Sequence, residues 1–228
     1  MFHNFNLNHI IVMLVPLVFA VTIHEVAHGY AALRMGDDTA RLAGRLTLNP
    51  FKHLDWFGSL LLPALLKFSG SPIIFGYAKP VPVNFLNFRD YRKGTLLVAS
   101  AGAAANLTLA VMSGAGFQAL LKYGPIWYDS FIQPVGMDLL MMLGYSAIIN
   151  SVLAVFNLIP IPPLDGSRIL AMILPAPLRK QFFRFERLGM LFIIFLLFTN
   201  TLNRLISYFL DPLIKFSLGK DGLAFIFG

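Results

Sequence analysis

A pair of histidines four residues apart, with a glutamate beside the first, is the strongest chemical pattern in the sequence. His24-Glu25-Val26-Ala27-His28 has the form H-E-x-x-H. Residues four apart lie on one face of a helix, so both imidazoles can hold one Zn²⁺. Glu25 then lies beside the ion as a base for water. The pattern predicts a hydrolytic zinc site with His24 and His28 as ligands.

Composition indicates that the helix carrying this pattern lies in a membrane. Of the 228 residues, 57% are hydrophobic and 13% are charged, whereas soluble domains are about 45–50% apolar and about 25% charged. A soluble domain of this length could not bury so much apolar surface, and 22 Phe exclude disorder. With no Cys, any metal site must use nitrogen and oxygen ligands. The net charge of +7 indicates cytoplasmic loops beside anionic lipid rather than a nucleic-acid partner.

Four apolar segments are long enough to cross a bilayer, which takes about 20 residues. They are expected at residues 8–33, 95–121, 135–159 and 188–210. A fifth segment, 57–77, is interrupted by Pro63 and Lys67, and we interpret it as a re-entrant or interfacial element. The predicted fold is an all-α integral membrane bundle of about four transmembrane helices with short extended loops. It is expected to form a single membrane-embedded domain over residues 1–228.

Basic residues predict the orientation of this bundle. Most Lys and Arg lie in two connections, at 34–94 and 160–187. With four spans, both connections lie on one side, which the positive-inside rule makes cytoplasmic. Both termini are then outside. The N-terminal segment has no basic region and no small-residue cleavage site, so we do not expect a signal peptide.

A catalytic zinc needs a third protein ligand and an open position. His24 lies roughly 24 Å along the first span, near the cytoplasmic third of the bilayer. Asp165 can reach this depth, because it follows the third span after prolines that end the helix. The alternative is that Asp165 caps a helix, and the interface remains an alternative setting for the H-E-x-x-H residues. The other candidate ligands lie on the outer side or in loops. His53 and Asp55 are expected to be accessory to the metal or to form hydrogen bonds. The full set of other candidates is Asp37, His53, Asp55, Asp90, Asp129 and Asp138.

These motifs resemble the site-2 protease family of intramembrane zinc metalloproteases. The H-E-x-x-H at 24–28 and the N-x-x-P-x-P-P-L-D-G run at 157–166 carry the resemblance. Residues 44–50 and 79–84 also look like membrane-associated loops of that family. The likeness covers residues 8–180 and indicates a compact member without PDZ or CBS domains.

The resemblance implies roles for individual residues. His24, His28 and Asp165 would bind one Zn²⁺ per chain, and Glu25 would be the general base. Asn157 would bind the substrate backbone or stabilise the oxyanion. Residues 101–106 resemble a G-P-x-x-N element with Ala103 in place of Pro. Asn106 therefore either contacts substrate or bridges two spans by hydrogen bonding.

The resemblance implies hydrolysis of peptide bonds in or near transmembrane segments of membrane proteins, as in regulated intramembrane proteolysis. The expected partners are a transmembrane protein substrate and the lipid bilayer, without nucleic acid. The expected location is a prokaryotic inner membrane, with the active site toward the cytoplasm. Alternatives are a metal-binding transporter, a catalytically silent membrane receptor and a structural assembly subunit. The Pro/Val segment 79–84 is expected to be extended, either as an edge for a substrate strand or as a surface loop.

Overall fold

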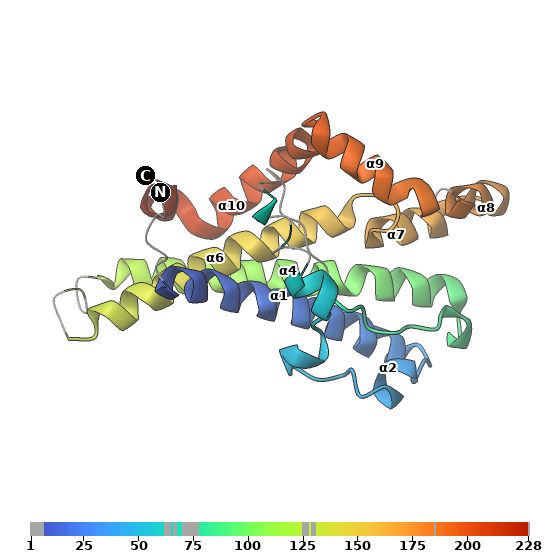
Figure 1. Cartoon of the computed structure of the whole chain (residues 1–228), viewed down its shortest axis with the longest axis horizontal. Coiled ribbons are helices and arrows are strands. Elements are labelled where there is room, and N and C mark those ends of the chain that lie inside the picture. Colours follow the sequence, from blue (N-terminus) through green and yellow to red (C-terminus); the bar gives the residue numbers. More distant parts are fainter. Residues whose placement is uncertain are drawn as a thin grey trace. The chain divides into compact units, whose positions relative to one another are not determined.

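The computed structural model describes residues 7–61, 65, 68–69, 78–124, 128, 131–184 and 186–227. Helices dominate this part of the chain, and it contains no strand (Figure 1). Three helices are long and apolar enough to cross a membrane: α1 (Leu7–Arg34), α4 (Tyr91–Lys122) and α6 (Gln133–Leu158). The all-α membrane fold and the first three predicted spans are thereby confirmed.

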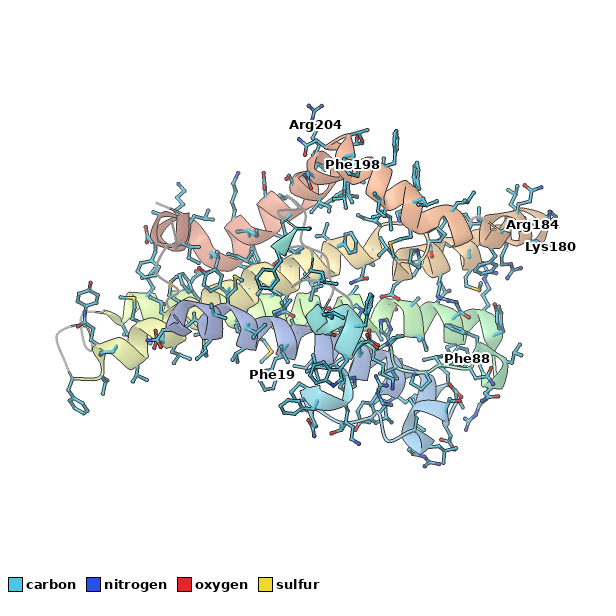
Figure 2. The ribbon with its side chains drawn as sticks, in the orientation of Figure 1. Phe19, Phe88, Lys180, Arg184, Phe198 and Arg204 are labelled. Carbon is cyan, nitrogen blue, oxygen red and sulfur yellow. The ribbon has the colours of Figure 1, made fainter. Side chains whose placement is uncertain are left out.

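The fourth predicted span differs from expectation because it is broken. Helices α9 (Glu186–Phe198) and α10 (Thr201–Phe227) pass the length and hydropathy test together, but they bend by 82° between Phe198 and Thr201. Asn200 has a φ of 57°, which ends the helical ladder there. The predicted continuous segment 188–210 is therefore a bent pair that extends to Ile226. Phe198 and Arg204 lie on either side of the bend (Figure 2).

Contacts divide the chain into two compact units, residues 1–20 with 103–228 and residues 21–102. In the first unit, α10 packs along α6 (Figure 1), around a core of Phe117, Leu140, Ala147 and Leu218. After α6 come two short helices, α7 (Asp165–Ile173) and α8 (Ala176–Arg184). The prediction of a single domain over the whole chain stays a prediction.

The second unit is built on the carboxyl-terminal half of α1 and the beginning of α4. Between them lie α2 (Thr39–Leu42), η1 (Pro50–Lys52), the π-helix η2 (Trp56–Leu61) and η3 (Phe85–Asn87). Only the start of the predicted re-entrant element 57–77 falls in η2, and most of the remainder lies outside the described residues. Its re-entrant character stays a prediction.

The amino-terminal half of α1 carries apolar side chains that other parts of the chain leave exposed. Phe19, for example, is 48% exposed (Figure 2). A soluble protein rarely exposes such a continuous apolar surface, whereas a lipid-facing helix requires one. The exposed residues of this stretch are Ile10, Ile11, Met13, Leu14, Val15, Leu17 and Phe19.

Candidate metal centre

The two histidines of the H-E-x-x-H motif face each other on successive turns of α1. Their Nε2 atoms lie 3.0 Å apart. Ligand atoms around one tetrahedral zinc ion are separated by about 3.3 Å, given bonds of about 2.0 Å. The Nδ1 atom of His28 lies 2.7 Å from the Val98 carbonyl oxygen, to which it can only donate. In that tautomer, Nε2 is the His28 nitrogen that carries a lone pair, and it is therefore the atom that would bind a metal.

Gly102 on α4 makes room for both imidazoles. A Cβ atom at Gly102 would lie 2.5 Å from His24 Cε1 and 2.5 Å from His28 Nε2. Atoms cannot approach so closely, so any side chain here would displace the rings. The position on α4 that faces the two imidazoles therefore requires glycine. Gly102 lies in the 101–106 run, where the sequence alone predicted no role for it.

The Asp165 carboxylate is carried by the first residue of α7. Helix α6 ends at Leu158, and α7 begins at Asp165. Its N-cap residue is Leu164, which makes no side-chain capping bond. Asp165 is thus the first residue of the helix rather than its cap. Gly166 is needed beside it, because a Cβ there would collide with the Leu158 carbonyl and lie 2.7 Å from Ile159 O.

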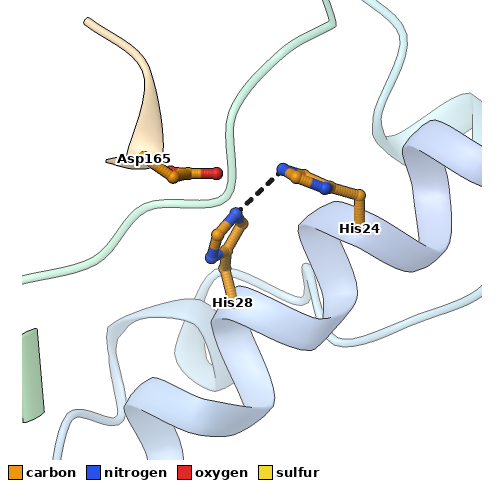
Figure 3. A group of neighbouring side chains, drawn as sticks. All are labelled: His24, His28 and Asp165. Carbon is orange, nitrogen blue, oxygen red and sulfur yellow. Dashed lines mark hydrogen bonds between the residues drawn. The ribbon is translucent and has the colours of Figure 1, made fainter. Parts of the chain in front are cut away.

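His24, His28 and Asp165 form a group of potential metal ligands (Figure 3). One ligand atom from each lies within 4.8 Å of the others. Two imidazole nitrogens and one carboxylate oxygen are a donor set that suits zinc and leaves a fourth position open. The donor chemistry of these residues therefore fits the metal that the motif predicts.

Glu25 does not belong to this ligand group, and its carboxylate has a backbone partner. Glu25 Oε2 accepts a hydrogen bond of 2.7 Å from the Val81 N–H. Val81 lies between Pro80 and Pro82, so it carries the one N–H of that tripeptide. The bond fixes one carboxylate oxygen and leaves Oε1 as the oxygen available to accept a proton.

The segment 79–84 that supplies this N–H is held at several points. Lys79 N donates to His53 O at 2.9 Å, and Asn84 N donates to Asp37 Oδ2 at 2.8 Å. The buried Arg45 guanidinium donates to Lys79 O at 2.7 Å. Residues 79–84 have no regular secondary structure and Asn84 has extended backbone angles, but the Val81 donor is already used by Glu25. The role of this segment as an edge for a substrate strand stays a prediction.

His53 and Asp55 support the loop rather than the metal. His53 is 1% exposed, and its Nε2 lies 2.9 Å from the Thr47 carbonyl. Asp55 accepts from Gly58 N at 2.7 Å, at the start of η2. Neither residue belongs to the ligand group among the described residues. This agrees with their predicted hydrogen-bonding character.

The two asparagines that were assigned to substrate have bonds inside the first unit. Asn106 is fully buried, and its Nδ2 donates to Asn150 Oδ1 at 2.7 Å and to Ala20 O at 3.2 Å. This contact favours the bridging interpretation for Asn106. Asn157 is part-buried and donates to Leu153 O at 3.0 Å, one turn earlier on α6. Its substrate role stays a prediction.

The sequence model of peptidase family M50 matches residues 12–199. The chain belongs to this family. M50 is the site-2 protease family, so the resemblance drawn from the two motifs is confirmed. Since its helices are long and apolar enough to span a bilayer, this M50 protein is an integral membrane protein.

Curated relatives of this M50 protein are bacterial. YwhC of Bacillus subtilis is 38% identical over 216 residues, covering 94% of this chain and 90% of YwhC. Rip2 of Mycolicibacterium smegmatis is 31% identical over 205 residues, covering 88% of this chain and 73% of Rip2. Both carry the name "Putative zinc metalloprotease". No solved structure matches the chain.

Three contributors to the site were missed by the sequence analysis: Gly102, the Val98 carbonyl and the Val81 N–H. A small-residue run such as 101–105 signals close helix packing, so Gly102 could have been suspected. The two backbone groups leave no signal in side-chain identity.

Proposed function

We propose that this M50 protein is an intramembrane zinc metalloprotease, which hydrolyses peptide bonds in or near transmembrane segments of membrane protein substrates. The observation that carries the proposal is the convergence of the His24 and His28 Nε2 atoms beside Glu25. Family membership and the names of the relatives support it. One Zn²⁺ is the proposed cofactor, with His24, His28 and Asp165 as ligands.

Zinc, when bound, supplies a Lewis acid that polarises the scissile carbonyl and makes water more acidic. Glu25 accepts the proton of the attacking water through Oε1, while the Val81 N–H holds Oε2. The water oxygen bonds to the carbonyl carbon, and the C–N bond then breaks. Glu25 delivers the proton to the leaving nitrogen. Asn157 can donate to the developing oxyanion after its amide leaves Leu153 O.

Burial supports the assignment of a reaction site that is largely shielded from bulk water. His24 is only 7% exposed, so the protein replaces most of its hydration. Electrostatic interactions strengthen in such a low-dielectric setting. The substrate helix must unwind there, because a helical peptide bond is shielded by its own hydrogen bonds.

We infer a bacterial cell membrane as the location, with the site toward the cytoplasm. The relatives are bacterial. The basic connections at 34–94 and 160–187 support the orientation through the positive-inside rule. The proposed partners are the bilayer and a transmembrane protein substrate.

The test combines metal analysis with cleavage of a fluorogenic model transmembrane peptide. The Glu25→Gln protein is expected to retain one zinc per chain and to lose cleavage. His24→Ala and Asp165→Ala are expected to lose the zinc as well. Asp138→Ala is the matched control, because Asp138 is exposed on α6 and lies outside the ligand group.

Cleavage by Glu25→Gln at the wild-type rate would remove Glu25 from the base role. Zinc retained by Asp165→Ala, or lost in the Asp138→Ala control, would contradict the ligand assignment. A wild-type protein that binds zinc, cleaves no peptide and carries zinc across liposomes would instead be a transporter.

A further inference from the structure

Helix α8 carries cations and apolar side chains that no part of the proposed catalytic machinery uses. Its sequence is Ala-Pro-Leu-Arg-Lys-Gln-Phe-Phe-Arg, over Ala176–Arg184. It contains three cations and no acidic residue. Apolar side chains that face water do not stabilise a helix in a cytoplasmic loop. The presence of Leu178, Phe182 and Phe183 in α8 therefore needs an explanation.

Two of the cations and two of the apolar residues of α8 lie on opposite faces. Lys180 and Arg184 are one turn apart and therefore share a face. Leu178 and Phe182 are also one turn apart, and helical spacing places them on the opposite side of the helix. Arg179 and Phe183 lie on one flank between these two faces, so the amphipathic character rests on the other four residues.

Packing within the protein covers neither face completely, although Phe182 on the apolar face is partly buried. Helix α8 contacts α7 and α9, which precede and follow it in the chain, yet none of its residues is buried. Leu178 is 50% exposed, and Lys180 and Arg184 are exposed too. Figure 2 shows the Lys180 and Arg184 side chains extending away from the α8 ribbon.

The carboxyl-terminal end of α8 lies close to the next apolar segment of the chain. The spanning helix α6 ends at Leu158, and α7 lies between it and α8, whereas the apolar part of the bent pair begins at Leu188, four residues after Arg184. A helix that ends so near a membrane-crossing segment stays near the level of the lipid headgroups. Its cations then face phosphates, and its apolar face lies at the boundary of the acyl chains.

We propose that α8 docks on the headgroup layer of an anionic phospholipid leaflet. Lys180 and Arg184 bind lipid phosphates, and Leu178 and Phe182 insert at the acyl boundary. Charge complementarity selects anionic lipid, because three cations without one acidic residue create a locally positive surface. The proposal does not depend on catalysis.

The first experiment measures the depth of each face in the full-length protein. The chain has no Cys, so Leu178→Cys and Gln181→Cys each provide a single site for a bimane label. The labelled proteins are reconstituted in vesicles of phosphatidylcholine and phosphatidylglycerol whose acyl chains are brominated. We expect blue-shifted, quenched emission from residue 178 and neither change from residue 181.

The second experiment measures lipid selection. The protein is equilibrated in micelles with equal amounts of phosphatidylglycerol and phosphatidylcholine, and the lipid that copurifies is quantified. Each cation near an anionic surface contributes a factor of about five, so Lys180→Gln/Arg184→Gln should lower the phosphatidylglycerol enrichment about 25-fold. Lys215→Gln/Lys220→Gln removes the same charge from exposed positions on α10 and serves as the matched control.

Four results would overturn the proposal. One is equal quenching of labels at 178 and 181. Another is wild-type enrichment in the Lys180→Gln/Arg184→Gln protein. The third is an equal loss in the α10 control, which would show that net charge alone selects the lipid. Emission typical of water at both label positions would place α8 away from the bilayer, as expected for a docking site for another protein.

Discussion

One backbone carbonyl determines which nitrogen of His28 can bind a metal. Because Val98 O accepts from Nδ1, the imidazole presents Nε2 toward His24. Hydrogen bonds of this kind orient metal-binding histidines and raise their basicity. Gly102 has a complementary effect, since its missing side chain lets α4 approach the two rings.

The Gly102→Ala substitution is expected to weaken zinc binding about 10- to 100-fold, in the range of other changes around metal ligands. The added methyl group would meet His24 and His28 at 2.5 Å, so the rings must move. Competition with a fluorescent zinc chelator measures the affinity. Gly116→Ala is the control on the same helix, because its Cβ would meet Leu143 at an ordinary 3.5 Å. Unchanged zinc affinity in Gly102→Ala would show that the rings do not need this space.

The Val81→Pro substitution is expected to lower kcat about 10- to 100-fold, with KM and zinc content unchanged. It removes the N–H that holds Glu25. The loss of one hydrogen bond to a charged group corresponds to a rate decrease of this size. Pro80 and Pro82 already favour extended backbone here, which proline also adopts. The fluorogenic transmembrane peptide gives kcat and KM separately.

Val81→Ala keeps the N–H and provides the control for lost packing. Similar losses in Val81→Ala and Val81→Pro would assign the effect to the valine side chain. A raised KM at constant kcat would assign the segment to substrate binding instead.

The site was predictable from sequence only where side chains alone specify it. His24, Glu25 and His28 stand at helical spacing, and Asp165 follows a proline run, so local patterns predicted a role for all four. Val98 and Val81 act through backbone atoms that every residue possesses. Only the fold determines which carbonyl or N–H lies beside an imidazole or a carboxylate.

At the scale of elements, one buried carboxylate organises the connection between α1 and α4. Asp37 is 0% exposed and accepts hydrogen bonds from Thr39, Asn84 and Asn87. It thereby ties the end of α1 to η3 and to the segment that reaches Glu25. Burial alone would raise the pKa of Asp37, but these hydrogen bonds together lower it below the ordinary value of 3.8.

This lowered pKa predicts how stability changes with pH. The folded chain binds a proton at Asp37 less readily than the unfolded chain does. The stabilisation is therefore complete above pH 3.8 and is lost as pH falls through the folded pKa. Asp37→Asn should have a lower Tm than the wild type at pH 6, and the difference should narrow below about pH 4.

Melting in detergent between pH 3 and pH 6 measures this prediction. Asp38→Asn is the neighbouring control, because Asp38 is exposed and pairs with Arg41 at the surface, where an ion pair contributes little. A Tm difference for Asp37→Asn that stays constant with pH would contradict an ionised Asp37 as the source of stability.

The positions of the spanning helices were predicted best where the apolar run was long and uninterrupted. The spans that became α1, α4 and α6 were located to within a few residues. The bend between α9 and α10 was not, because Asn200 interrupts the run without a proline or glycine. Its left-handed φ is stabilised by Asn203, which donates to Asn200 Oδ1 at 2.6 Å, and such a local bond is not evident from hydropathy.

At the scale of the whole molecule, the proposed orientation depends on whether the bent pair α9–α10 adds a fourth crossing to those of α1, α4 and α6. The bent pair α9–α10 must count as one crossing for the chain to end on the side where it began. If α9 and α10 did not cross together, the carboxyl-terminal end would lie on the same side as the basic connections. The position of α10 therefore tests the complete topology.

Single cysteines in this Cys-free chain can test that arrangement. Lys52→Cys and Gln181→Cys lie at exposed positions in the two basic connections, whereas Tyr123→Cys follows α4 and Asp221→Cys lies near the end of α10. In intact cells, a membrane-impermeant maleimide should label residues 123 and 221 because both lie outside. Residues 52 and 181 should react only after permeabilisation, since positive loops remain cytoplasmic. Protection of residue 221 in intact cells would show that α9 and α10 do not complete a crossing, and labelling of residue 52 would invert the proposed orientation of the metal centre.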